Sequence, residues 1–148
     1  MKIIKANKSR IKEWVDMRLA LWPKHTRPEL TREAKHILVS RRESAFLVVD
    51  GSGSAVGFAE VSTRDYVDGC KGGPVGFLEG IYVRPGHRKK GIALRLVRAG
   101  ELWAAARGCR EMGSDTQING RRSIAFHKAV GFRVVERQVV FMKKIKRQ

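Results

Sequence analysis

One stretch of this chain decides the fold: residues 75–93 read VGFLEGIYVRPGHRKKGIA. Its first nine residues are mostly apolar and predict a buried strand, and Pro85 predicts a turn after it. A basic loop follows, and a helix is predicted to begin near Gly91. Backbone N–H groups converge at a helix start, and the small residues Gly91 and Ala93 let a phosphate approach the main chain. We therefore predict a pyrophosphate site at residues 88–93.

Outward from this stretch, hydrophobic spacing and turn residues predict the other elements. Apolar residues recur at helical spacing from residue 8 until Pro23, and again from Gly91 until Gly108. Two strands flank the turn Gly51-Ser52-Gly53-Ser54 and form a hairpin. The predicted helices are residues 8–21, 30–40, 91–107 and 121–130, and the predicted strands are residues 1–5, 45–49, 55–63, 75–83, 110–115 and a closing pair within 132–144.

These motifs resemble the GNAT superfamily of N-acetyltransferases. The Arg-x-x-Gly-x-Ala pattern at residues 88–93 is similar to the acyl-coenzyme A binding motif of that superfamily, and the predicted element order matches its fold over nearly the whole chain. Four segments more narrowly resemble the bacterial aminoglycoside 6'-N-acetyltransferases. They are LEGIYVRPGHRKKG at residues 78–91, SDT at 114–116, HKAVGF at 127–132 and LWP at 21–23.

The resemblance implies an α/β (α+β) GNAT fold. Its central sheet is mixed and mostly antiparallel, is splayed between the fourth and fifth strands, and is flanked by about four helices. It also implies direct transfer of an acetyl group from acetyl-CoA, in a ternary complex and without a metal, to the 6'-amino group of an aminoglycoside, which gives antibiotic resistance. A homodimer is implied as well, and residues 134–142 are a candidate for its edge. A polyamine or a protein amine stays open as an alternative acceptor.

Length and composition limit the remaining classes. A chain of 148 residues with 43% hydrophobic content supports one core, so we expect a single domain over residues 1–148. Cys70 and Cys109 lack CxxC spacing and fit a reducing cytoplasm. The start, MKIIKANKSR, is too polar for a signal peptide, and no apolar run approaches the roughly 20 residues of a membrane span. We expect a cytoplasmic protein with no membrane partner.

The net charge of +17, from 31 basic and 14 acidic residues, makes a nucleic acid the first partner to consider. However, the basic residues are spread along the chain, and neither an RNP-like aromatic stretch nor a paired metal-ligand motif is present. We therefore expect no nucleic-acid partner, although a basic nucleic-acid-binding domain remains the more remote alternative. One basic cluster without acids suits the phosphates of the coenzyme: Arg84, Arg88, Lys89, Lys90, Arg95 and Arg98.

Two carboxylates are candidates for the acceptor site. Strand alternation places Glu79 among apolar neighbours, where an unpaired charge is costly. Either a bulge at Gly80 turns Glu79 outward or into an ordinary ion pair with an arginine, or the bulge opens a cleft in which Glu79 faces the acceptor amine. Asp115 follows the next predicted strand, where ligands of open α/β sheets bind, but it could also cap a helix. The resemblance implies that both hold the reactive amine.

The resemblance assigns further residues. His127 stands where many GNAT enzymes carry a tyrosine that protonates the leaving thiolate, and it could serve as that acid or only contact the coenzyme or cap the helix. The expected coenzyme contacts are Ile81, Val83, Arg88, Lys89, Lys90, Gly91, Ile92, Ala93 and Asn119. The expected acceptor contacts are Trp22, His25, Tyr66, Glu79, Asp115 and Glu136, with Asp65 and Asp68 as further acidic candidates. For Trp22 a core position, and for His25 an ordinary surface position, are the alternatives.

Overall fold

The computed structural model describes residues 1–147, in two compact units that divide after Asp115. The first unit, Met1–Asp115, holds a five-stranded sheet in the order β1-β2-β3-β4-β5. Strands β1 to β4 pair antiparallel, and β5 pairs parallel to β4. The strands are β1 (Lys2–Lys5), β2 (Glu43–Val49), β3 (Ala55–Arg64), β4 (Val75–Val83) and β5 (Met112–Ser114), and the helices of this unit are α1 (Ile11–Leu21), α2 (Arg27–Val39) and α3 (Ile92–Ala105), with single 3-10 turns at Lys8–Arg10 and Pro85–His87.

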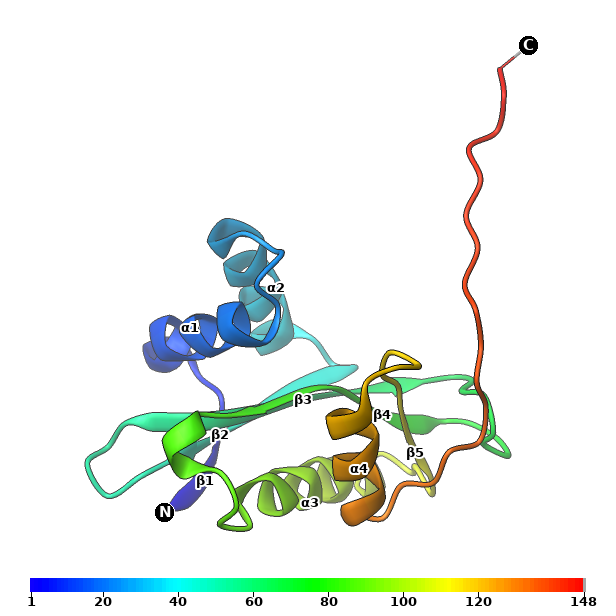
Figure 1. Cartoon of the computed structure of the whole chain (residues 1–148). Coiled ribbons are helices and arrows are strands. Elements are labelled where there is room, and N and C mark those ends of the chain that lie inside the picture. Colours follow the sequence, from blue (N-terminus) through cyan, green and yellow to red (C-terminus); the bar gives the residue numbers. More distant parts are fainter. Residues whose placement is uncertain (148) are drawn as a thin grey trace. The chain divides into compact units, whose positions relative to one another are not determined.

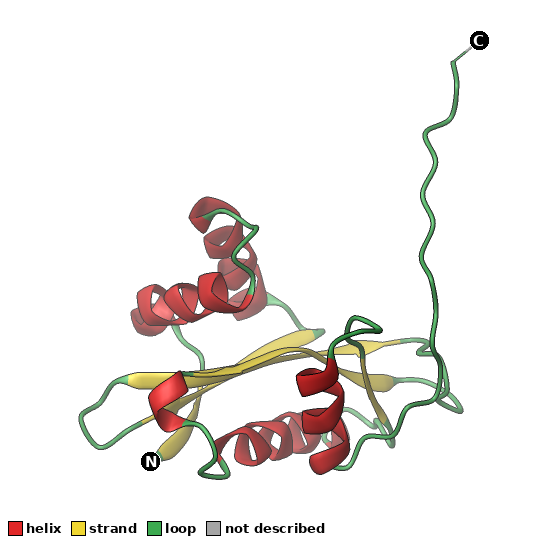
Figure 2. Cartoon of the chain, viewed as in Figure 1, coloured by secondary structure: helices red, strands yellow, loops and turns green. Residues whose placement is uncertain are grey.

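Helices α1 and α2 cover one face of the sheet, and α3 covers the other face (Figure 1, Figure 2). This arrangement and the mixed strand pairing confirm the expected GNAT fold. The predicted positions of β4, α1 and α3 agree with the structure to within about three residues. Helix α2 begins at Arg27, three residues before its predicted start, because Thr26 caps it and Pro28 lies in its first turn, where a missing N–H costs nothing.

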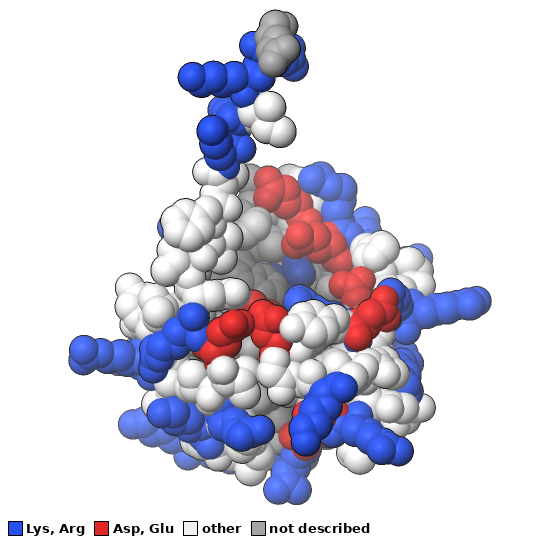
Figure 3. Space-filling model, turned by 90° about the vertical axis from the view of Figure 1, so that its right-hand side faces the viewer, with Lys and Arg blue, Asp and Glu red and all other residues white. Residues whose placement is uncertain are grey.

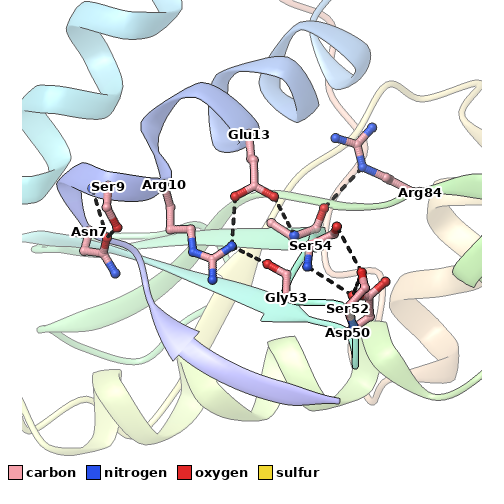
Figure 4. Close-up of polar contacts among 10 residues, drawn as sticks. Asn7, Ser9, Arg10, Glu13, Asp50, Ser52, Gly53, Ser54 and Arg84 are labelled. Atoms are coloured by element: carbon pink, nitrogen blue, oxygen red, sulfur yellow. Dashed lines mark hydrogen bonds and ion pairs between the residues drawn. The ribbon is translucent and has the colours of Figure 1, made fainter.

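Polar contacts attach the β2–β3 hairpin to the start of α1 (Figure 4). Glu13 accepts a hydrogen bond from the backbone N–H of Ala55 at 2.7 Å, and this bond holds the pKa of its carboxyl below the usual value. Arg10 bridges Glu13 and the carbonyl of Gly53. On the other side, Arg84 Nε donates to the Ala55 carbonyl at 3.3 Å. The hairpin therefore joins α1 to the segment that follows β4.

A buried ion pair fixes α1 on the sheet. Arg18 donates from Nε and Nη2 to the two carboxylate oxygens of Glu60 at 2.7 and 2.9 Å, and Trp14 Nε1 donates to Glu60 at 2.8 Å. Both partners are buried, with side chains 5% and 3% exposed. Burial raises the pKa of the Glu60 carboxyl, and the donors Arg18 and Trp14 oppose that rise. The contact between Arg18 and Glu60 is bidentate, and two donors of Arg18 and one of Trp14 bond to the carboxylate. These bonds compensate the cost of burying the two charges.

The sheet is irregular at the middle of β4. Glu60 pairs with Gly80 and Val61 pairs with Leu78, so Glu79 is the extra residue of a β-bulge. Strand β5 pairs with β4 only at Gly76, Phe77 and Leu78. Residues 79–83 of β4 therefore have a strand neighbour on the β3 side alone, as the expected splay between the fourth and fifth strands requires.

The second unit starts at Thr116 and contains α4 (Arg121–Ala129). A left-handed Gly131, with φ 105°, follows the end of the helix. The prediction of a closing pair of strands within 132–144 is wrong, because no residue from 132 to 147 belongs to a strand. A strand needs a neighbour for its backbone hydrogen bonds, and the described part of the chain pairs none with this segment. No helix in residues 1–147 is both long and apolar enough to cross a membrane.

We expect Arg18→Met to lower the free energy of unfolding by about 3–5 kcal/mol, because it leaves the Glu60 carboxylate buried without its partner. Urea denaturation measures this loss. Arg42→Met is the matched control, since Arg42 pairs with Asp65 at an exposed site, with side chains 60% and 90% exposed, and we expect it to cost no more than about 1 kcal/mol. Equal losses in the two variants would contradict a stabilising role for the buried pair.

Candidate active site

A cavity of about 510 Å³ lies beside the bulge of the first unit. Its walls come from α1, α2 and the sheet, and its lining includes Trp22, His25 and Glu79. Its volume falls within the range of small-molecule sites, about 300–1,000 Å³. The structure thus brings together three of the residues predicted to contact the acceptor.

Trp22 forms its wall because of the glycine in the bulge. A Cβ atom at Gly80 would lie 2.6 Å from the Trp22 ring, so only glycine lets the ring approach the strand. The ring also packs edge-on against Phe58, with centroids 6.1 Å apart, and lies 4.9 Å from the Arg18 guanidinium carbon. Trp22 is therefore held in place by packing and at the same time lines the cavity, which agrees with both interpretations of this residue.

Glu79 is exposed, because as the extra residue of the bulge it leaves the alternation of β4 and turns outward, as the first interpretation expects. Arg64 Nη2 donates to its two oxygens at 2.9 and 3.0 Å, and Ser62 Oγ donates to Oε2 at 2.5 Å. The structure thus contains the ion pair of the first interpretation. The same carboxylate also lines the cavity, as the second interpretation requires.

Asp115 lies directly after β5 and is exposed. The last pair of the parallel ladder joins Leu78 to Ser114, and Ser114 Oγ donates to the Leu78 carbonyl at 3.2 Å. Glu79 and Asp115 are therefore the next residues on neighbouring strands, which lie about 5 Å apart where they pair. Asp115 does not line the 510 Å³ cavity.

The cavity is acidic although the chain is strongly basic. Four glutamates line it against two arginines, whereas basic residues outnumber acidic ones 31 to 14 over the whole chain. Figure 3 shows acidic side chains close together on one face, with Lys and Arg directed outward around them. Sequence reasoning missed three of these glutamates, which are Glu33, Glu43 and Glu60. For Glu60 a signal existed, because Arg18 and Glu60 are opposite charges within an apolar helix face and an apolar strand.

Other acceptor candidates lie elsewhere. Tyr66 is 72% exposed in the segment after β3, and Asp68 is exposed in the same segment. Asp65 lines a second cavity of about 500 Å³, which shares Glu79 and Glu43 with the first cavity. Glu136 is exposed and belongs to the second unit. No group of three His, Cys, Asp or Glu side chains among residues 1–147 could hold a metal ion.

The basic loop before α3 has the backbone of an anion site. Lys89 and Gly91 both have positive φ, 62° and 75°, and turns with left-handed residues are typical of concave backbone sites that bind anions. No side chain caps α3 at Gly91, and a Cβ placed there would meet nothing within 4 Å. Arg88 donates from Nε to the Val83 carbonyl at 2.7 Å and thereby fixes the turn. These features fit a diphosphate contacted by main-chain donors, with Lys89 and Lys90 exposed beside it.

The remaining residues predicted to contact the coenzyme lie on β4, in the first turn of α3 and in a turn of the second unit. Ile81 and Val83 pair with Ala59 and Gly57 of β3, and β5 has already ended beside them. Ile92 is buried and Ala93 half-buried in the first turn of α3. Asn119 lies in a turn of the second unit and lines a cavity of about 540 Å³ together with three basic residues, which are Arg121, Lys128 and Arg137.

His127 lies on α4 of the second unit. Its Nδ1 is 2.7 Å from the Ser123 carbonyl oxygen, so Nδ1 carries a proton and, in the neutral ring, Nε2 is the acceptor nitrogen. The ring packs edge-on against Phe126 and Phe132, with centroids 5.5 and 5.2 Å away. The position of the imidazole is therefore fixed within its unit by one hydrogen bond and two aromatic contacts.

Comparisons with known proteins agree with this geometry. Residues 10–132 match the family model described as the acetyltransferase (GNAT) family. An "aminoglycoside N(6')-acetyltransferase type 1" of Salmonella enteritidis is 39% identical over 145 residues, which are 97% of this chain and 99% of that protein. The structure of the apo aminoglycoside 6'-N-acetyltransferase AAC(6')-IG of Acinetobacter haemolyticus superposes with a TM-score of 0.94 and 36% identity, covering 99% of this chain and 100% of that one.

A third similar protein, AAC(6')-Iy, has been solved in complex with the bisubstrate analog CoA-S-monomethyl-acetylneamine. It superposes with a TM-score of 0.92 and 37% identity, over 97% of this chain and 98% of that chain. These similarities confirm the resemblance deduced from residues 78–91, 114–116 and 127–132. By its family-model match and its near full-length relatives, the chain belongs to the acetyltransferase (GNAT) family.

Proposed function

We propose that this protein transfers the acetyl group of acetyl-CoA to the 6'-amino group of an aminoglycoside and so gives resistance to the antibiotic. The observation that supports this most directly is the acidic cavity, in which glutamates outnumber arginines four to two. An aminoglycoside carries several ammonium groups, and carboxylates at contact range outweigh cationic side chains beyond the screening length of about 8 Å. Acetylation converts one ammonium into a neutral amide and so removes one positive charge from the antibiotic.

Glu79 and Asp115 are proposed to hold the reactive amine. The attacking group is a free amine, so the bound ammonium first loses a proton to Glu79, directly or through a water. The amine nitrogen then forms a bond to the thioester carbonyl carbon, the C–S bond breaks, and the coenzyme leaves as a thiolate. The nitrogen gives up its remaining extra proton to solvent, which leaves a neutral amide. A backbone N–H near Ile81 is proposed to stabilise the oxyanion, since β4 has no β5 neighbour there.

The coenzyme is proposed to follow β4 and the loop after it. Its pantetheine arm extends the sheet along Ile81 and Val83, and its pyrophosphate lies on the main-chain N–H groups of residues 88–93. Asn119 is proposed to contact the pantetheine arm. His127 has two proposed roles that stay open: it protonates the thiolate from the imidazolium form, or it only contacts the coenzyme.

Trp22 and His25 are proposed as acceptor contacts on the cavity wall, with Trp22 as a flat surface for a sugar ring. Tyr66 and Glu136 remain proposed acceptor contacts from other segments. A polyamine is the second candidate acceptor, because the same excess of glutamates would bind any flexible polycation.

A cytoplasmic location is part of the proposal. Cys70 and Cys109 are both free thiols, and reducing compartments maintain thiols in this form. Burial raises the pKa of both thiols, so neither is prepared to act as a nucleophile.

We expect the purified protein to acetylate tobramycin and kanamycin at the 6'-amine in the presence of acetyl-CoA, with slower turnover of spermidine. Thiol release measures the rate, and NMR of the product identifies the acetylated nitrogen.

Glu79→Gln and Asp115→Asn are expected to raise the acceptor's KM or lower kcat by about tenfold or more, because each removes a charge that holds the ammonium. The Kd of acetyl-CoA is expected to stay unchanged.

Glu101→Gln is the matched control for these two variants, because it removes one carboxylate from the exposed side of α3, on the opposite face of the sheet. Its kinetics should equal those of the wild type. Normal turnover by Asp115→Asn would exclude Asp115 from the reaction, and faster turnover of spermidine than of either antibiotic would favour the second acceptor.

We expect Gly91→Val to abolish binding of acetyl-CoA in isothermal titration calorimetry. A β-branched residue is strained at φ 75° and places its methyl groups where the diphosphate approaches. Gly86→Val adds the same side chain in the same loop, at a glycine without positive φ and with open space around an added Cβ, and should bind normally. An unchanged Kd for Gly91→Val would refute a main-chain phosphate site.

A homodimer is also proposed, with residues 134–142 at its edge. This segment exposes a run of apolar side chains, among them Val139, Val140, Phe141 and Met142, each at least 72% exposed, and such patches mark interaction surfaces. In sedimentation velocity we expect the wild type to be a dimer and Phe141→Lys to be a monomer. Leu102→Lys, at an exposed apolar position of α3, should remain a dimer. Dissociation by Leu102→Lys alone would place the interface on α3 instead.

A further inference from the structure

Arg64 forms an ion pair with Glu79, the carboxylate that is proposed to bind the cationic acceptor. We propose that Arg64 is an affinity-determining residue, which holds Glu79 while the acceptor is absent and is displaced by the acceptor's ammonium group. This inference rests on the proposed role of Glu79. Arg64 lies outside the coenzyme loop and is not among the predicted acceptor contacts. The inference nevertheless gives it a direct effect on the acceptor's KM.

The contact between the two side chains is close and nearly symmetrical. Arg64 ends β3, and Glu79 is the bulged residue of β4. Arg64 Nη2 contacts both carboxylate oxygens, at 2.9 and 3.0 Å, and its Nε adds a contact of 3.3 Å. One guanidinium thus spans the carboxylate and neutralises it. An ammonium group that binds Glu79 with full strength must take over the sites that Arg64 fills.

Exposure makes this exchange feasible. The side chains of Arg64 and Glu79 are 44% and 32% exposed, and exposed pairs are worth little because water competes for both partners. The displaced guanidinium also keeps a second contact, because its carbon lies 3.5 Å from the centroid of the Phe77 ring, and arginine stacks well on aromatic faces. Arg64 can therefore leave the carboxylate without losing every partner.

The second cavity provides a matched control. It is lined by both Arg64 and Arg42. Arg42 pairs with Asp65 at 2.9 Å and makes no contact with Glu79 among the described residues. Removing Arg42 takes away the same charge from the same cavity and leaves the Glu79 pair intact. Any effect of Arg64 beyond that of Arg42 is therefore due to its contact with Glu79.

The test is the KM of tobramycin at saturating acetyl-CoA for Arg64→Gln, Arg42→Gln, Glu79→Gln and the double variant Arg64→Gln/Glu79→Gln. We expect Arg64→Gln to lower the KM about two- to fivefold, which is the strength of an exposed ion pair. Arg42→Gln should change it by less than half of that factor. The double variant should match Glu79→Gln, because Arg64 acts only through Glu79. Arg64→Lys, which keeps the charge but not the bidentate contact, should give a smaller decrease.

Each other outcome overturns the inference. An unchanged or raised KM for Arg64→Gln means that Arg64 does not compete or that it positions Glu79, and an equal decrease in Arg42→Gln means that only the general field matters. The role of Glu79 itself is tested separately, because Glu79→Gln with a normal KM contradicts that role whatever Arg64 does. Thermal unfolding and the Kd of acetyl-CoA, which we expect to be unchanged, show that each variant is folded.

Discussion

The buried contact between Arg18 and Glu60 determines where the 510 Å³ cavity, the proposed acceptor site, can form. Glu60 pairs across the sheet with Gly80, so the ion pair fixes α1 on the strand directly opposite the bulge. Trp22 follows α1 and comes against Gly80, where only the absence of a Cβ admits its ring. Without the bidentate contact, only the hydrogen bond from Trp14 would compensate the desolvation of Glu60. The position of α1 on the sheet would then no longer be fixed, and neither would the position of the Trp22 ring against the bulge.

Strand β4 arranges two sites of opposite charge along one stretch of chain. Glu79 in its middle faces the acidic cavity, the backbone of residues 81–83 lacks a β5 neighbour, and the loop at residues 88–93 has the geometry of an anion site. The proposed transfer of an acyl group from a polyanionic donor to a polycationic acceptor requires such an order. The bulge contributes to both sites. It turns Glu79 outward, and it coincides with the end of the pairing between β4 and β5, which leaves residues 81–83 without a β5 neighbour.

Local patterns predicted most of the fold from the sequence. The strand and loop at residues 75–93 were predicted correctly because alternation, Pro85 and Gly91 are local signals. The start of α2 was predicted late, since Pro28 ends a helix or begins one depending on its cap, Thr26. The strands within residues 132–144 were predicted from hydrophobic spacing and turn residues, and such a local pattern does not supply a pairing partner. Three glutamates of the cavity were missed because the tertiary packing of α2 on the sheet brings them together.

Burial separates the Arg18–Glu60 and Arg64–Glu79 pairs into different roles. Arg18 and Glu60 are 5% and 3% exposed, so no solvent or ligand can replace either partner, and the pair is structural. Arg64 and Glu79 are 44% and 32% exposed, so water already competes for both. The two pairs have similar hydrogen-bond distances, but replacing one partner by water or a ligand costs more free energy in the buried pair than in the exposed pair. Because Arg64 occupies Glu79, the proposed acceptor can use this carboxylate only if the arginine is weakly held. Exposure at the bulge provides that weak hold.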